Sequence, residues 1–122
     1  MDAAEFKRRT MRFGSSVIDL VESMPPKLTA GVLGKQLIRA ATSVGANYRA
    51  ACRAKSPADF VYKLGLVEEE VDESAYWLEL IELRSLARSS SLRPLLREAD
   101  EITAMVVASI QTARGNGRGL KR

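Results

Sequence analysis

The chain has 122 residues, of which 46% are hydrophobic and 28% charged, and its formal net charge at pH 7 is +4. This length predicts one domain, and this composition is typical of a globular protein that buries a core without disulfides or a structural metal. Histidine is absent, which excludes serine triads, cysteine–histidine dyads, histidine-ligated zinc and the Glu-x-x-His di-iron sites of helical bundles.

Cysteine usage and hydropathy indicate the compartment. The single cysteine, Cys52, cannot form a disulfide within one chain, which is typical of the reducing cytoplasm. We expect its thiol to be buried, with a structural role only. No apolar run is long enough to cross a bilayer, and the first residues, MDAAEFKRRTMRF, lack the hydrophobic segment of a signal peptide. The sequence therefore predicts a soluble, cytoplasmic protein without membrane contact.

Two amphipathic helices are predicted in the first half of the chain, where apolar residues recur at helical spacing. The first helix ends at Pro25-Pro26, and its apolar stripe consists of Phe6, Thr10, Phe13, Val17, Leu20 and Met24. The second is expected to begin at an N-cap on Thr29 and to end near Ala54. Its apolar face consists of Leu33, Leu37, Ala40, Ala41, Val44, Tyr48 and Ala51.

The second half of the chain predicts two further helices. Ser56 as N-cap, Pro57 in the first turn and Asp59 three residues after the serine indicate the start of a third helix, which we extend to about Ala87. Its core stripe consists of Phe60, Leu64, Val67, Val71, Ser74, Ala75, Leu78 and Ile81. After the serine-rich break at 88–91, the fourth helix is marked by Leu95, Ala99, Ile102, Val106, Ile110 and Ala113.

No strand-like alternation or internal repeat interrupts these four segments. Four helices joined by short loops are most simply arranged as an all-α, antiparallel up-down-up-down four-helix bundle. We expect this bundle to span residues 1–113 and to be followed by a flexible basic C-terminal tail at 114–122.

The second helix carries a row of cations opposite its apolar face. At about 100° per residue, this row occupies an arc of roughly 80°; we name it the basic strip, and it consists of Lys35, Arg39, Arg49 and Arg53. Together with a basic tail, the strip predicts nonspecific binding to the phosphates of RNA or DNA; the cations of the tail are Arg114, Arg118, Lys121 and Arg122. The alternative is a solvated helix face whose ion pairs each contribute about 0 to 1 kcal/mol.

The third helix has the opposite charge, with eight acidic residues and one lysine between Ser56 and Leu83. A mixed strip opposite its core stripe predicts an oligomer interface, formed by Leu66, Glu69, Glu73, Tyr76 and Leu80. If a neighbour's basic strip covers this surface, the basic strip serves self-assembly. The protein would then be a protein–protein scaffold or an accessory subunit with a protein partner.

A longer pattern resembles a known family. Residues 36–83, QLIRAATSVGANYRAACRAKSPADFVYKLGLVEEEVDESAYWLELIEL, are similar to the small bacterial four-helix-bundle proteins that include the products of intervening sequences in ribosomal RNA genes; the matching positions are Gln36, Leu37, Arg39, Ala40, Ser43, Asn47, Lys55 and Ser56. The stretch 47–51, NYRAA, departs from the family's common N-I-A-E-G. The resemblance implies a homopentameric barrel without established catalytic activity. Accessory proteins of diversity-generating retroelements form a related branch that binds nucleic acid through a basic surface.

An enzyme is the third possibility. Glu69-Glu70-x-x-Glu73 has the E-E-x-x-E spacing with which all-α nucleoside-triphosphate pyrophosphatases hold magnesium. Those enzymes also need an E-x-x-D on the following helix, and the later acidic cluster, Glu98, Asp100 and Glu101, lacks this spacing. We therefore predict no catalytic residues, no metal site and no cofactor.

Overall fold

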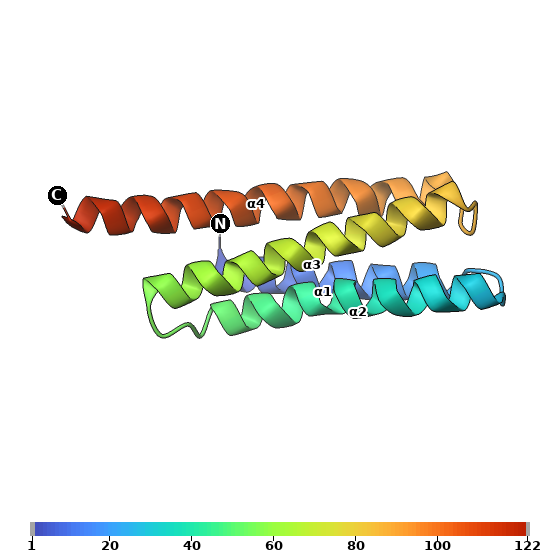
Figure 1. The fold of residues 1–122 in the computed structure, drawn as a ribbon, viewed down its shortest axis with the longest axis horizontal. Coiled ribbons are helices and arrows are strands. Elements are labelled where there is room, and N and C mark those ends of the chain that lie inside the picture. The colour runs from blue at the N-terminus through green and yellow to red at the C-terminus, as the bar shows by residue number, and fades with distance from the viewer. Residues whose placement is uncertain (1, 122) are drawn as a thin grey trace.

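The computed structural model describes residues 2–121, with side chains for residues 2–115. Its helices are α1 (Ala3–Glu22), α2 (Leu28–Ala51), α3 (Pro57–Leu83) and α4 (Ser89–Lys121), and they run alternately up and down one long axis (Figure 1). α2 packs against α1 and α3, α3 packs against α4, and a smaller contact between α1 and α4 closes the bundle. The predicted all-α, up-and-down four-helix fold is confirmed.

Local hydrogen bonds set the helix starts. The N–H of Asp59 donates to Ser56 Oγ at 3.0 Å, with Pro57 in the first turn, as predicted. The predicted N-cap at Thr29 is wrong, because α2 begins at Leu28 after Lys27, whose side chain makes no capping hydrogen bond. Lys27 takes the extended conformation of an N-cap, two residues before Thr29, so the helix begins without the oxygen cap that the sequence suggested.

The helix ends differ more from expectation. α2 and α3 end earlier than predicted, at Ala51 and Leu83, and α4 continues through the predicted tail to Lys121. Ser85, at φ 54°, turns the chain after α3. This turn places Leu86 in the core. The apolar residues of the sequence therefore continue at helical spacing past Leu83, although the helix itself has ended there. At its C-terminus, α4 projects past the other three helices (Figure 1).

One apolar stripe from each helix forms the core. Its largest side chains, all less than 2% exposed, include Phe6, Phe13, Leu37, Leu64, Leu78, Ile81, Leu92 and Ile102. The buried hydroxyls of Thr10 and Ser74 donate to carbonyl oxygens one turn earlier in their own helices, so neither polar group is left without a partner. No helix in the described part of the chain has the combination of length and hydrophobicity that a membrane span requires.

Candidate nucleic-acid interface

The basic strip is exposed, but only Lys35, Arg39 and Arg49 lie on α2. Arg53 lies in the turn after α2, because the helix ends at Ala51 and not near Ala54 as predicted. One of its members, Arg39, is held by α3: it forms an ion pair with Glu73, and its Nη1 lies 3.7 Å from Glu70 Oε2. The Glu73 carboxylate also accepts a hydrogen bond from Trp77 Nε1 at 3.2 Å. Arg39 therefore links α2 to α3, and its positive charge is largely compensated within the chain.

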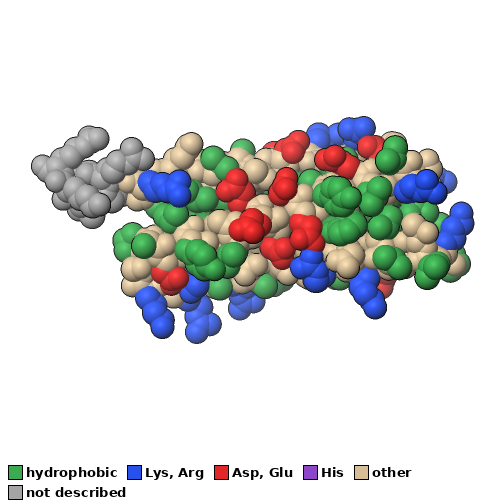
Figure 2. Space-filling model, viewed as in Figure 1, with side chains coloured by type: hydrophobic (Ala, Val, Ile, Leu, Met, Phe, Trp, Pro, Cys, Tyr) green, Lys and Arg blue, Asp and Glu red, His purple; other side chains and the backbone are tan. Residues whose placement is uncertain are grey.

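The other three members of the strip face solvent. Within residues 2–115, Lys35, Arg49 and Arg53 form no ion pair. Figure 2 shows acidic side chains gathered in the middle of the face formed by α3 and α4, and basic side chains along the lower edge, along part of the upper edge and at the right-hand end. The basic side chains of the lower edge lie on the side of α2, where cations unpaired among the described side chains attract anions.

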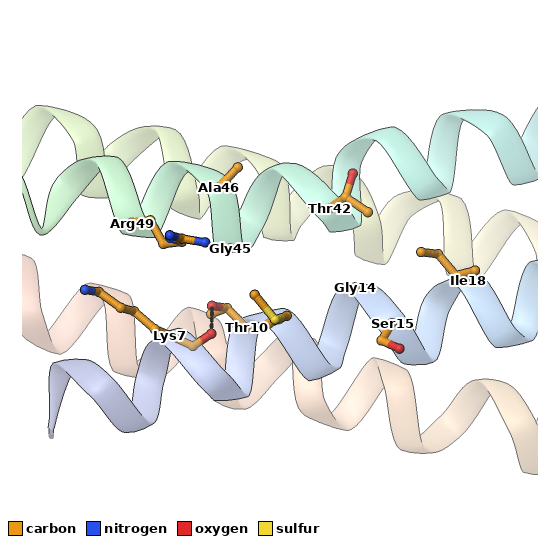
Figure 3. Close-up of a pocket in the computed structure, with 10 residues that line it drawn as sticks. Lys7, Thr10, Gly14, Ser15, Ile18, Thr42, Gly45, Ala46 and Arg49 are labelled. Carbon is orange, nitrogen blue, oxygen red and sulfur yellow. Dashed lines mark hydrogen bonds between the residues drawn. The ribbon is translucent and has the colours of Figure 1, made fainter.

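A groove between α1 and α2 adds a cation that the sequence analysis missed. The groove has a volume of about 330 Å³, and Lys7 of α1 and Arg49 of α2 lie together at one end of it (Figure 3). Residues 7, 11, 14 and 18 all line it. Their spacing of four, three and four marks a second stripe beside the core stripe of α1, and this signal could have identified Lys7.

Close helix packing forms the floor of this groove. A Cβ at Gly45 would lie 3.3 Å from Thr10 Oγ1, which is a tight contact. The absence of a side chain at Gly45 therefore lets α1 and α2 approach closely. The rest of the lining is mostly small or apolar, and it includes Met11, Gly14, Ser15, Ile18, Thr42 and Ala46.

The predicted interface residues of α3 occupy different environments. Glu69 and Tyr76 are exposed, whereas Leu66 and Leu80 are half-buried, with Leu80 packed against the core. Glu73 is bound by Arg39. Two further large side chains on this helix, Tyr62 and Leu83, are 65% and 78% exposed. We name the whole row the α3 ridge, and it consists of Tyr62, Leu66, Glu69, Glu73, Tyr76, Leu80 and Leu83.

Arginines occupy the acidic cluster that has the spacing of a magnesium motif and also the later acidic cluster on α4. Arg39 neutralises Glu73 and lies near Glu70, and Arg9 of α1 holds Glu98 and Glu101. Among the described side chains, no three acidic or cysteine residues are grouped closely enough to hold a metal ion. Four carboxylates of these clusters are thus engaged in helix–helix contacts, namely Glu70, Glu73, Glu98 and Glu101.

Arg114 and Cys52 lie near the end of the bundle from which α4 projects (Figure 1). Arg114 is exposed, and the side chains of Arg118, Lys121 and Arg122 lie outside the described residues. The expected burial of Cys52 is wrong: the residue is exposed, because α2 ends at Ala51 and the chain turns away there.

Cys52 borders a groove of about 860 Å³ that Phe60 and Met105 also line. In the same place, burial raises the pKa of the Tyr48 phenol, and a hydrogen bond with Cys52 adds to the shift.

Comparisons place this fold among known proteins. No curated protein matches the chain. A crystal structure of a protein of unknown function from the S23 ribosomal protein family of Bacteroides thetaiotaomicron is similar to it, with a TM-score of 0.84 and 29% sequence identity over 91% of this chain and 99% of that chain. A family model described as 23S rRNA-intervening sequence protein matches residues 3–108. Because this match covers α1 to α3 and more than half of α4, the chain belongs to the 23S rRNA-intervening sequence protein family.

Proposed function

We propose that this protein is non-enzymatic, associates with itself, and binds the phosphate backbone of RNA or DNA without sequence preference. The observation that carries the proposal is the row of exposed cations along α2 and the turn that follows it, in which Lys35, Arg49 and Arg53 form no ion pair among the described side chains. Arg114 is a further exposed cation near the end of α4. Such a cationic surface without interleaved aromatic residues favours contact with phosphates over reading of bases.

Self-association would make this binding effective. Three cations neutralise about three phosphates, which supports only weak binding for one copy at physiological salt. Several copies in one assembly add their contacts and raise the overall affinity without any new type of contact. The family resemblance gives five copies as the expected number. The cations at Arg118, Lys121 and Arg122 would add to each copy's contribution.

A protein–protein scaffold is the second candidate. It is favoured by the α3 ridge, where Tyr62, Tyr76 and Leu83 are each more than half exposed on one helix. A magnesium-dependent pyrophosphatase is less consistent with the geometry, because such chemistry needs free carboxylates. Here, Arg39 and Arg9 engage Glu73 and Glu98. The proposal therefore includes no catalytic residue, metal or cofactor.

The nucleic-acid proposal is tested by fluorescence anisotropy with labelled duplex and single-stranded probes over a series of salt concentrations. Lys35→Gln combined with Arg53→Gln should weaken binding to every probe sequence equally. The double variant should also reduce the salt dependence of binding. The slope of the logarithm of the association constant against the logarithm of the salt concentration should become shallower by about two for each copy that contacts the probe, because each copy loses two phosphate contacts. Size-exclusion chromatography with light scattering on the same samples reports whether the variant still assembles.

The matched control is Arg84→Gln combined with Arg88→Gln, which removes the same charge from two exposed residues beside the α3–α4 turn. This control should bind as the wild type does. If both pairs weaken binding equally, only net charge matters and the basic strip has no special role. If the assembled wild type ignores nucleic acid even at low salt, the proposal is wrong and the scaffold function takes its place.

A further inference from the structure

Two surfaces of the bundle are complementary in polarity and charge. The α3 ridge has three exposed large side chains, Tyr62, Tyr76 and Leu83, and two carboxylates at its centre, whereas the α1–α2 groove is apolar with two cations at one end. We propose that the α3 ridge of one copy docks in the α1–α2 groove of a second copy. This inference rests on the self-association in the proposed function and specifies which surfaces meet.

The ridge has the geometry of a helix that packs against another helix. Its seven residues are separated by alternating steps of four and three, the spacing that aligns side chains along a coiled-coil seam. Tyr76 is 57% exposed and Tyr62 is 65% exposed. Large aromatic side chains in such a row contribute strongly to interfaces when a partner covers them, because they bury a large area with few rotatable bonds.

The groove has the geometry of an acceptor for a helix. Gly14, Gly45 and Ala46 present little side-chain bulk between α1 and α2, and Met11, which is 61% exposed, offers an apolar surface at the rim. Figure 3 shows this lining with Lys7 and Arg49 at one end and Ile18 at the other. Small residues let helices approach closely, so side chains of a docked helix could fill the space.

Charge fixes the register of the two surfaces. Glu73 is already paired with Arg39, so Glu69 is the ridge carboxylate that is free, among described side chains, to meet Lys7 and Arg49. Glu69 and Tyr76 are seven residues apart, about 10 Å along the helix, and Arg49 and Thr42 have the same separation. A ridge with Glu69 beside Arg49 therefore places Tyr76 beside Thr42, where the groove is lined by small residues.

This register makes the docked α3 antiparallel to the neighbour's α2, as it is within one chain (Figure 1). A rotation about an axis parallel to the helices leaves the direction of every helix unchanged. Such a rotation can therefore relate the two copies. The ridge and the groove are different surfaces, so the contact is head-to-tail and generates a closed ring or an open filament. Lys35 and Arg53 lie outside the groove lining and remain available to phosphates.

The test uses variants that each damage one surface. Tyr62→Glu combined with Tyr76→Glu adds acids to the ridge, and Met11→Glu combined with Ala46→Glu adds acids to the groove; all four positions are exposed. We expect each variant alone to be a folded monomer by light scattering and circular dichroism. When the two variants are mixed one to one, they should form a heterodimer. The intact ridge of the groove variant can dock in the intact groove of the ridge variant, whereas the two damaged surfaces repel each other. Val32→Glu, at an exposed α2 residue outside both surfaces, should assemble as the wild type does.

The outcomes separate this inference from the proposed function. A folded variant that stays fully assembled, or a mixture that stays monomeric, overturns the ridge–groove contact and leaves nucleic-acid binding by the assembly untouched. A monomeric wild type overturns self-association and this contact together. Anisotropy on the folded ridge variant reports phosphate binding by single copies. It should show weak, salt-sensitive binding if the basic strip acts as proposed.

Discussion

At the scale of single residues, the buried phenol of Tyr48 couples stability to alkaline pH. Tyr48 is 4% exposed, and its ring meets that of Phe6 edge-on at 4.6 Å. Burial disfavours the phenolate and raises the pKa of Tyr48 above the ordinary value of about 10. Between about pH 10 and this raised value, the unfolded chain releases a proton that the folded chain retains. The contribution of Tyr48 to the free energy of unfolding is therefore complete below about pH 10 and decreases as pH rises.

Replacing Tyr48 with Phe should remove this part of the pH dependence. We expect urea unfolding between about pH 8 and pH 11 to show a shallower loss of stability in Tyr48→Phe than in the wild type. Below about pH 9, where the phenol is protonated in both states, the two proteins should show the same slope, and this range is the internal control. Equal slopes above this range in the wild type and Tyr48→Phe would mean that the phenol ionises equally in both states.

At the scale of elements, the α1–α2 contact depends on a close approach at Gly34. A Cβ at Gly34 would lie 2.6 Å from Val21 Cγ1 and 3.3 Å from Met24 Cε, whereas a Cβ at Gly31 would have no neighbour within 4 Å. Both glycines lie inside α2, so alanine improves helix propensity by a similar amount at each. Gly31→Ala should stabilise the fold by about 0.5 to 1 kcal/mol.

Gly34→Ala should instead destabilise the fold by about 1 to 2 kcal/mol, because overpacking against the stiff Val21 outweighs the gain in helix propensity. Urea unfolding of the two variants beside the wild type measures the difference. If Gly34→Ala were as stable as Gly31→Ala, the two helices would have moved apart without loss, and the close packing would have no energetic importance.

The sequence predicted the existence and type of every helix, because each apolar stripe has helical spacing and Ser56-Pro57 carries an explicit capping signal. Three helix ends were less predictable. Leu86 continues the apolar spacing although it lies after the turn at Ser85. The N-cap of α2 is Lys27, which has no side-chain oxygen to mark a helix start in the sequence. Cys52 is exposed because α2 stops one residue before it.

The candidate site was predictable in composition and less so in its contacts. Periodicity placed Lys35, Arg39 and Arg49 on one face of α2, where the structure has them, whereas Arg53 lies in the turn after the helix. It could not indicate that Arg39 is paired with α3 or that Lys7 of α1 joins Arg49 across a groove. Both facts depend on the rotation of neighbouring helices about their axes, which a single helix's pattern does not determine.

At the scale of the whole molecule, Arg9 joins the first helix to the last. Its Nε donates to Glu98 Oε2 at 2.7 Å, and its Nη2 donates to Glu98 Oε1 at 2.9 Å and to Glu101 Oε1 at 2.8 Å. These bonds raise the pKa of Arg9 further above its ordinary value. Arg9 and Glu98 are only about one-quarter exposed, which makes this ion pair stronger than one in open solvent.

Arg9→Gln should lower the free energy of unfolding by about 1 to 2 kcal/mol. Arg8→Gln removes the same charge from an exposed neighbour that forms no ion pair among the described side chains, so it should change stability by less than about 0.5 kcal/mol. Chemical unfolding at low and high salt measures both, and salt should reduce the Arg9 effect only partly. Equal losses in the two variants would indicate a general charge effect.

The order in which the helices pack also bears on how the chain folds. Each helix packs mainly against its neighbour in sequence, and the contact between α1 and α4 is the smallest. Such a chain has low contact order, and helical proteins of this kind fold in about microseconds to milliseconds. The contacts of Arg9 with Glu98, Glu101 and Met105 span 89, 92 and 96 positions, so the α1–α4 seam closes the longest loops among these hydrogen bonds and has the largest cost in chain entropy. Closure of this seam is therefore the entropically most expensive step in completing the fold.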